Sequence, residues 1–166
     1  MKQISILIVA MFMAVTAFAQ EGKELYNKYS GKEGVSAVYI SPTMFEMIKQ
    51  IPDIELEGES LNIGELIKTF EGMYILNIEN GELCSEVEKN VEELVGKGRY
   101  KLLMEAMDGG DRVHIYIVQD GDTVTDFLML AGEAAQGQTD GTVAVISISA
   151  RMAISELQKL LASAMQ

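Results

Sequence analysis

The histidine at position 114 is the first residue whose type suits proton transfer, and it is the only histidine in the chain. It lies in a segment where polar and apolar residues alternate as in a β-strand, so His114, Arg112, Tyr116 and Val118 share one face. Catalysis needs a constellation of groups, and the sequence shows no nucleophile placed to serve this imidazole. We therefore expect a solvated or hydrogen-bonded histidine. A small hydrolase using carboxylates or His114 is the alternative.

The single cysteine, Cys84, falls in the first turn of a predicted helix, where the helix N-terminus lowers a thiol pKa. The nearby acids Glu82, Glu86 and Glu88 oppose that effect. One cysteine also excludes an internal disulfide and a cysteine zinc cluster. We expect Cys84 to fill a half-buried apolar position, and pairing between two chains is the alternative.

Two acidic, glycine-bearing connections are candidate cation ligands. Asp108 and Asp111 flank the first, and Asp120 and Asp122 the second, and oxygens brought together at adjacent turns would suit calcium. The alternating spacing of an EF-hand is absent, however, and tight turns select Asp and Gly for backbone reasons alone. The sequence therefore predicts hairpin turns, with an acidic small-ligand or calcium carrier as the alternative.

Motifs for phosphate loops, dinucleotide binding and the G-x-S-x-G nucleophile elbow are all missing. The glycines between residues 132 and 141 are accompanied by Glu133 and Asp140, which would repel a phosphate. We accordingly expect no catalytic residue, no cofactor-binding residue, no metal ligand and no cofactor, and the more economical reading is a protein that is not an enzyme.

Methionine is the remaining chemically adaptable residue type. It can line promiscuous binding surfaces, but it more often fills a core. We predict core filling for the methionines in the expected strands and helices, which are Met44, Met47, Met104, Met107, Met129 and Met152.

Composition limits the class of partner. The 166 residues include 13 Lys and Arg against 25 Asp and Glu, a formal net charge of -12. Nucleic acids and anionic membranes are bound by basic stripes, and the chain has none. The length fits one domain, which we expect over residues 20–166.

The first 19 residues are typical of a signal peptide. Lys2 provides the positive start, residues 4–19 form an uncharged run of 16 residues, and Ala17 and Ala19 supply small side chains before a cleavage site at Gln20. A membrane-spanning helix needs about 20 apolar residues, so we favour a cleaved leader over an anchor. No cysteine follows the small residues, hence no lipid anchor is expected, and the protein is predicted to be periplasmic or secreted.

The remaining sequence alternates helical and extended patterns. Hydrophobic spacing of three and four residues predicts helices at 21–30, 42–51, 62–70, 82–95 and 150–165. Alternating and β-branched segments predict strands at 35–41, 73–78, 100–107, 112–119, 123–130 and 142–149. A polar loop is expected at 132–141, and an acidic connection at 53–59.

These elements predict an α+β fold. Short turns between consecutive strands can only join antiparallel neighbours, so we expect an antiparallel-rich mixed sheet of about six strands with helices mostly on one face. The last strand is apolar on both faces, with Val143 and Val145 on one and Ala144, Ile146 and Ile148 on the other. Such a strand is either central or covered by another chain.

Several segments resemble one family along nearly all of the mature chain. They are Leu25–Val35, Val38–Phe45, Phe70–Leu76 and the turn Asp120–Asp122. With these segments the chain resembles domain-of-unknown-function family 4252, small exported proteins and lipoproteins of Bacteroides-type bacteria. The resemblance carries over no catalytic residue. It implies a role in the cell envelope, with envelope-stress regulation suggested because genes of such proteins are often found near extracytoplasmic sigma-factor genes.

Taken together, the sequence predicts an exported, non-enzymatic envelope protein that binds a protein or surface partner through a sheet face or edge, or that self-associates.

Overall fold

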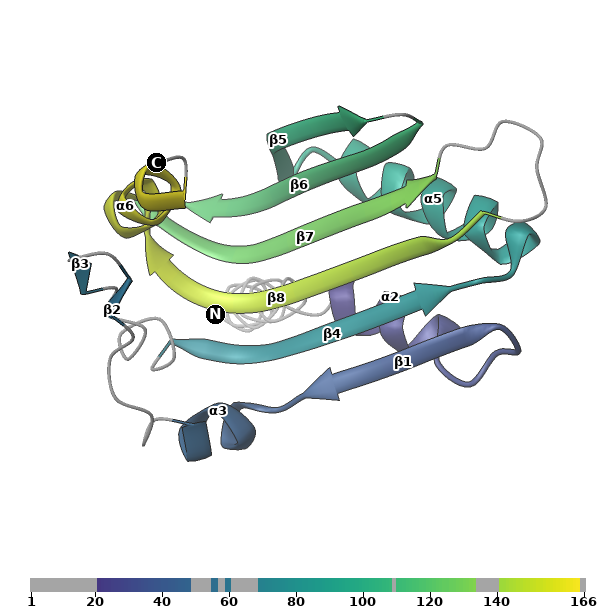
Figure 1. The fold of residues 1–166 in the computed structure, drawn as a ribbon, viewed down its shortest axis with the longest axis horizontal. Coiled ribbons are helices and arrows are strands. Elements are labelled where there is room, and N and C mark those ends of the chain that lie inside the picture. The colour runs from purple at the N-terminus through teal and green to yellow at the C-terminus, as the bar shows by residue number, and fades with distance from the viewer. Residues whose placement is uncertain are drawn as a thin grey trace, which may run out of the picture.

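A six-stranded antiparallel sheet is the main element of the computed structural model, which describes residues 21–48, 55–56, 59–60, 69–108, 110–133 and 141–164. Its strands lie in the order β1–β4–β8–β7–β6–β5 (Figure 1). Their bounds are β1 Val35–Ile40, β4 Phe70–Ile78, β5 Tyr100–Asp108, β6 Asp111–Asp120, β7 Thr123–Glu133 and β8 Val143–Ala153. A separate two-stranded hairpin joins β2 Glu55–Leu56 and β3 Glu59–Ser60.

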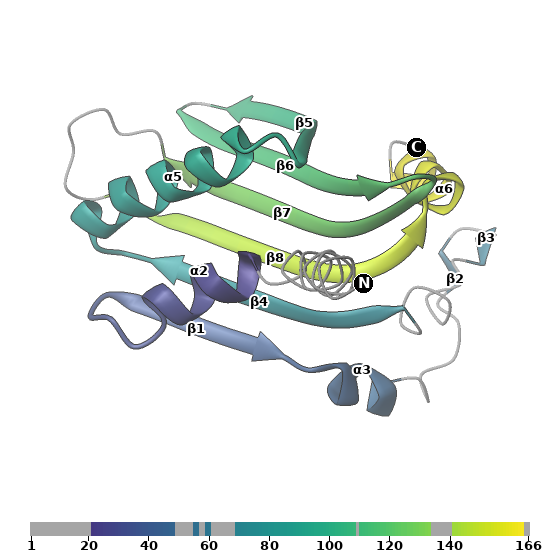
Figure 2. The same cartoon turned by 180° about the vertical axis from the view of Figure 1, so that it is seen from behind.

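The helices are distributed unequally over the two faces of the sheet. They are α2 Glu21–Tyr29, α3 Pro42–Ile48, α5 Gly81–Gly96 and α6 Ile154–Ala164. Helices α2 and α5 both cover the same face, which we call the helix face (Figure 2). Helix α6 packs at one end of the opposite face, against Ile117, Val124 and Met152. The α+β class and the six-stranded antiparallel sheet confirm the prediction, whereas two of the four described helices, α2 and α5, lie on the same face.

The meander β5–β6–β7 follows from its turns. Asp120 pairs with Thr123 across the β6–β7 turn, and Gly121 between them has a φ of 58°. Only glycine and a few small polar residues adopt that conformation without strain, so the Asp-Gly-Asp sequence suits a tight hairpin. Every described strand pair is antiparallel, as such turns require.

Helix α5 begins where its sequence predicts. The side chain of Asn80 accepts hydrogen bonds from the backbone N–H of Glu82 at 3.1 Å and of Leu83 at 3.3 Å, which satisfies two donors that the first turn leaves unpaired. The buried stripe then recurs at helical spacing and faces the sheet. Its members are Cys84, Val87, Val91 and Leu94.

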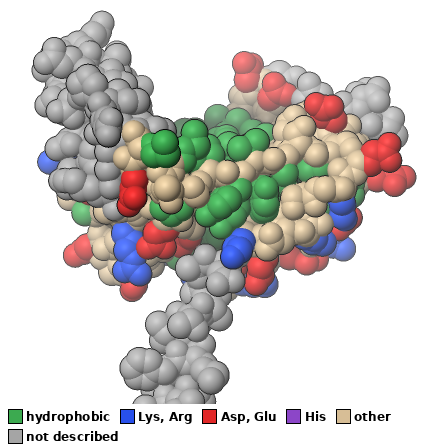
Figure 3. All heavy atoms as spheres, turned by 90° about the horizontal axis from the view of Figure 1, so that it is seen from below, with side chains coloured by type: hydrophobic (Ala, Val, Ile, Leu, Met, Phe, Trp, Pro, Cys, Tyr) green, Lys and Arg blue, Asp and Glu red, His purple; other side chains and the backbone are tan. Residues whose placement is uncertain are grey.

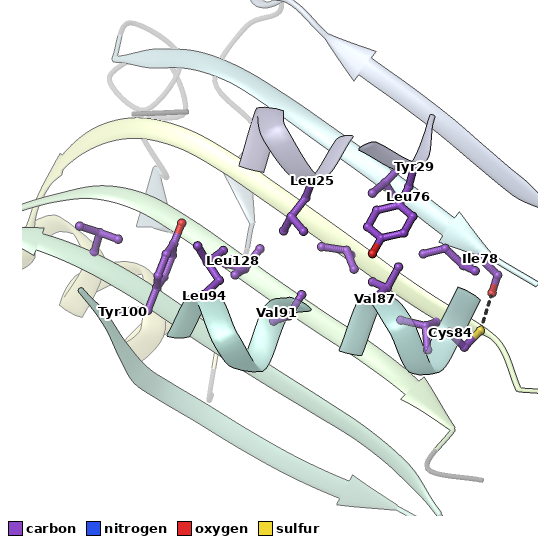
Figure 4. Close-up of a cluster of buried hydrophobic side chains, with 13 residues drawn as sticks. Leu25, Tyr29, Leu76, Ile78, Cys84, Val87, Val91, Leu94, Tyr100 and Leu128 are labelled. Atoms are coloured by element: carbon purple, nitrogen blue, oxygen red, sulfur yellow. Dashed lines mark hydrogen bonds between the residues drawn. The ribbon is translucent and has the colours of Figure 1, made fainter. Parts of the chain in front are cut away.

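The core lies between this stripe, helix α2 and the helix face of the sheet (Figure 4). Tyr29 of α2 is fully buried, and its hydroxyl donates a hydrogen bond to Glu86 Oε1 at 3.0 Å. The amide of Asn90 donates to the same hydroxyl. Because Glu86 and Asn90 belong to α5, this network ties the two helices together over the sheet.

Helix α2 approaches β8 very closely at Gly22. A Cβ atom at this glycine would lie 1.8 Å from Ser147 Oγ and 2.5 Å from Ser147 Cβ. The Ser147 side chain is itself buried at the centre of the sheet. The absence of a side chain at Gly22 is therefore what allows the first turn of α2 to pack on the sheet.

Several predicted boundaries were wrong. The final helix begins at Ile154 rather than Ala150, because Met152 and Ala153 still pair with Val124 and Thr123 of β7. The end of the helix predicted for 62–70 was also wrong, since Phe70 opens β4, and the acidic connection contains the β2–β3 hairpin. The rest of that helix, the leader at 1–19 and most of the loop at 132–141 lie outside the described residues.

Candidate functional site

The face of the sheet opposite α2 and α5, which we call the open face, is apolar across all six strands. The side chains of cross-strand partners point to the same side of a sheet, so the strand register shows which residues belong to the open face. Its apolar members are Val38 and Ile40 of β1, Met73 and Ile75 of β4, Ala144, Ile146 and Ile148 of β8, Phe127, Met129 and Ala131 of β7, Val113, Ile115 and Ile117 of β6, and Met104 and Ala106 of β5. Polar members lie at its ends, including Ser36, Asn77, Asp108 and Asp111 at one end, and Lys101 at the other.

Strand β8 shows how the two faces differ in burial. On the helix face Val143 and Val145 are 1% and 2% exposed, because the helices cover them. On the open face Ala144, Ile146 and Ile148 all retain partial exposure, although they are equally apolar. An antiparallel sheet with one solvated face normally carries polar residues on it, so this composition departs from the usual pattern.

The exposure increases toward both edges of the open face. Val38 on the edge strand β1 is 50% exposed, and Met104 on the other edge strand, β5, is 44% exposed. Viewed from the β1 edge, hydrophobic side chains gather in a band, while most acidic and basic side chains lie around it (Figure 3). Monomeric proteins rarely expose a large contiguous apolar surface, and where one occurs it commonly marks an interaction site.

Helix α6 covers one end of this face. Leu157 of α6 is buried against Ile117 of β6, Val124 of β7 and Met152 of β8, and Phe127 packs at the margin of the same cluster. The middle row of the open face, which crosses the sheet from Val38 to Met104, is not part of that cluster. The candidate binding surface is therefore the open face beyond α6.

A second candidate is a polar cleft of about 630 Å³ at the end of the sheet where β6 turns into β7. Its volume falls within the range of small-molecule sites. Its charged lining residues come from several strands and balance one another. They are Glu71, Arg99, Lys101, Asp120, Asp126 and Arg151.

The charges around this cleft are largely paired within the chain. Arg151 Nε lies 3.4 Å from Glu71 Oε1, and Arg99 Nη1 lies 3.3 Å from Glu21 Oε2 at the start of α2. Asp126 is only 8% exposed, and both of its oxygens accept hydrogen bonds, from Thr125 Oγ1 at 2.8 Å and Ser149 Oγ at 3.0 Å. A carboxylate satisfied in this way holds strand ends together, so we assign the cleft a structural role.

Tyr100 lies behind the same cleft and is buried. Burial raises the pKa of its hydroxyl far above the ordinary value, and the negative charges of Glu21 and Asp126 raise it further. A phenol of that kind stays neutral at physiological pH and cannot act as a base there.

His114 shares a strand face with Tyr116, as its alternation predicted, and the structure shows that this is the helix face of β6. Its Nε2 is 3.5 Å from Glu105 Oε2 on β5, and its ring stacks on Tyr116 with 6.0 Å between centroids. These contacts explain the imidazole as a partly buried, paired side chain. They bring it no serine, threonine or cysteine nucleophile, which is what a hydrolase dyad would require.

Cys84 is more deeply buried than predicted, because it lies on the stripe of α5 that faces the sheet. Its thiol donates to the carbonyls of Ile78 at 3.4 Å and Gly141 at 3.1 Å. Burial raises the thiol pKa, with a smaller contribution from the negative charge of Glu88. This is the environment of an apolar core filler rather than of a reactive thiol.

The acidic turns do not come together. Asp108 and Asp111 close the β5–β6 hairpin, whereas Asp120 and Asp122 lie at the other end of the ten-residue strand β6. Both connections are hairpin turns, as predicted, and the alternative that their carboxylates approach one another is not met, because the two turns lie at opposite ends of β6. Within the described ranges, no three His, Cys, Asp or Glu side chains converge on a point where a metal ion would bind.

The prediction that the methionines fill the core was mostly wrong. Met152 is buried, but Met44, Met47, Met104 and Met107 are all exposed, up to 74% for Met47. Met104 and Met107 lie on the edge strand β5, where there is no further strand to cover them. Four exposed methionines instead favour the alternative of an adaptable binding surface.

The sequence analysis missed two features of the site. It predicted a second apolar face only for the last strand, although apolar residues also alternate in residues 113–117 and 127–131. The cleft was missed entirely, and its one local signal is Asp126, an acid on the same strand face as the buried Leu128. An acid on a buried strand face is rarely tolerated without partners.

Comparison with known proteins identifies the family. A family model described as "Domain of unknown function (DUF4252)" matches residues 29–160, which include all six strands of the main sheet. No curated protein and no solved structure matches the chain. Of the helices that the structure describes, none combines the length and apolar character needed to cross a membrane. Since the match extends over most of the sequence, the chain belongs to the DUF4252 family.

Proposed function

We propose that this chain is an exported, non-enzymatic protein of the bacterial cell envelope, and that it binds another protein through the open face of its sheet. The observation that carries the proposal is the apolar composition of a sheet face whose side chains remain partly exposed on every strand. Export is supported by the leader-like residues 1–19, and an envelope role, including stress regulation, by the family resemblance.

The chemistry of the face favours a protein over a membrane or a nucleic acid. Its central rows are uncharged, and its charged residues, including Lys101, Asp108 and Asp111, lie at its ends. The chain as a whole has a net charge of -12 and therefore lacks the basic surface that binds phosphate groups. Apolar rows that end in the exposed Met104 pack well against protein side chains.

Photo-crosslinking in cells would test this proposal. A photoreactive amino acid at Val38 or Met104 places the probe at either edge of the open face, where both side chains are already exposed. The matched control carries the probe at Glu92, an exposed position on α5 on the other side of the sheet. We expect protein adducts from the two open-face probes and none from the control.

Equal adducts from Glu92, or none from Val38 and Met104, would overturn the binding function. Fractionation of the same cells tests the location separately: recovery of the protein in the cytoplasm with residues 1–19 still attached would contradict export.

A further inference from the structure

We propose that the occupant of the open face is a second copy of this chain, packed sheet against sheet as a two-fold dimer. This inference rests on the proposed binding function and names its partner. Sheets stack face to face about 10 Å apart when their facing rows are apolar, and a two-fold dimer requires only one such surface. The face provides it, since its rows consist mainly of aliphatic, methionine and alanine side chains, with Lys101 at the β5 end of the row that contains Ile117.

The area fits a weak, reversible contact. Six strands spaced about 4.8 Å apart, and three side-chain rows about 6.8 Å apart, span roughly 24 by 20 Å, and the part that α6 covers at Ile117 and Phe127 leaves roughly 400 Å² on each copy. Two copies would then bury roughly 800 Å², in the range of weak, transient interfaces. We therefore expect a reversible dimer in the micromolar range rather than a permanent one.

The charge distribution permits two acidic copies to meet there. Many of the acids lie on the helices of the opposite face, including Glu24 on α2 and Glu82, Glu92 and Glu93 on α5. A layer of helix lies about 10 Å outside its sheet, so these charges would be about 30 Å apart across the dimer. That separation exceeds the Debye length of about 8 Å at physiological salt, and the repulsion is screened.

Helix α6 restricts how the copies meet. A helix is about 10 Å thick, which equals the spacing of stacked sheets. One α6 therefore fits beside the end of the partner's sheet, but two α6 helices cannot lie on top of each other between the two sheets. The sheets can pack together when the two-fold axis places the two α6 helices at opposite ends of the dimer. The middle of the six-stranded face lies between β8 and β7, where Ile146 pairs with Met129. Residues there would face their own counterparts.

The first experiment measures the mass in solution. Sedimentation velocity of the purified full chain between 1 and 100 µM should show a shift from one chain to two. Met104→Glu should weaken the dimer at least tenfold, because it buries a charge in the interface. Met107→Glu is the matched control: Met107 lies on the same edge strand and is also exposed, but its partner Arg112 places it on the helix face. It should leave the dimer within twofold of the native protein.

The second experiment locates the axis. Met129→Cys, combined with Cys84→Ala, should form a disulfide-linked dimer under mild oxidation, whereas Glu92→Cys in the same background should not. Met104 and Met107 are both exposed, so the chain with Met104→Glu or Met107→Glu should still fold, and circular dichroism checks this. Val38→Glu provides a second disruptive variant at the opposite edge.

Each outcome decides between the two proposals. A monomer at 100 µM, or equal effects of Met104→Glu and Met107→Glu, overturns the dimer. If the cellular adducts at Val38 and Met104 then contain a different protein, the binding function stands without the dimer. If there are no adducts, both fail. Adducts of twice the chain mass, with a dimer sensitive only to Met104→Glu and Val38→Glu, support both.

Discussion

Replacing Gly22 by alanine tests the closest contact between a helix and the sheet. Alanine is favoured over glycine in helices by about 1 kcal/mol, so helix propensity alone predicts stabilisation. The structure predicts the opposite, since the new Cβ would lie 1.8 Å from Ser147 Oγ and 2.5 Å from Ser147 Cβ. The hydroxyl can rotate away, but the Cβ is fixed to the central strand β8. Overpacking of this kind costs about 1–3 kcal/mol, so the sum is a net loss of up to about 2 kcal/mol.

A second substitution makes the prediction specific. Ser147→Gly removes both clashing atoms and leaves Ser147 Cα at 3.9 Å, an ordinary contact. Alone it should cost about 0.5–1 kcal/mol, because glycine loses more backbone freedom on folding. In the presence of Ser147→Gly, the change Gly22→Ala should become neutral or stabilising. The two substitutions should thus be coupled by about 1–3 kcal/mol.

Urea unfolding followed by far-UV circular dichroism measures all four proteins of this cycle. Gly96→Ala is the matched control, since Gly96 also lies at a helix end but a Cβ there would meet nothing within 4 Å. It should stabilise the chain by up to about 1 kcal/mol. The packing of α2 on β8 would be refuted if Gly22→Ala stabilised like Gly96→Ala, or if the two substitutions were additive within about 0.5 kcal/mol.

Three further outcomes follow from the described contacts. The thiol of Cys84, buried and bonded to two carbonyls, should react with a disulfide reagent at pH 8 only when urea unfolds the chain, and rapid labelling of the folded protein would contradict its burial. Asn80→Ala removes the cap of α5 and should lower the free energy of unfolding by about 1 kcal/mol in urea titrations, so a change below about 0.3 kcal/mol would argue against the cap. Burial raises the folded pKa of Tyr100 above its unfolded value of about 10, so its contribution to stability is complete below pH 10 and declines as the pH rises further. Tyr100→Phe should therefore lose less stability between pH 9 and 11 than the native chain, and identical pH profiles would contradict this.

Local patterns predicted the elements better than their ends. The recurrence of Leu83, Val87, Val91 and Leu94 defined α5, and Asp-Gly-Asp at 120–122 defined a hairpin, because helix periodicity and turn chemistry act over a few residues. The boundary at Ala150 was wrong because strand pairing with distant residues 123–124 extends β8 beyond its alternating segment. Such tertiary pairing overrides local preference.

The candidate site depends on strand order, which the sequence does not determine. Val38 and Met104 are separated along the chain, yet they end the same row because β1 and β5 are the two edges of one sheet. The exposure of Met104 follows from that edge position and not from its neighbours in sequence. The cleft near Asp126 likewise combines residues from five strands, so no single segment could have indicated it.

The position of β8 between β4 and β7 also determines when the sheet can form during synthesis of the chain. In the sheet, strand β4 pairs with β1 on one side and on the other with β8, the last of the six strands in sequence. A two-stranded β1–β4 unit is at best marginally stable alone. The β1–β4 pair therefore gains its second neighbour only after the three strands of the β5–β6–β7 meander and then β8 have been made.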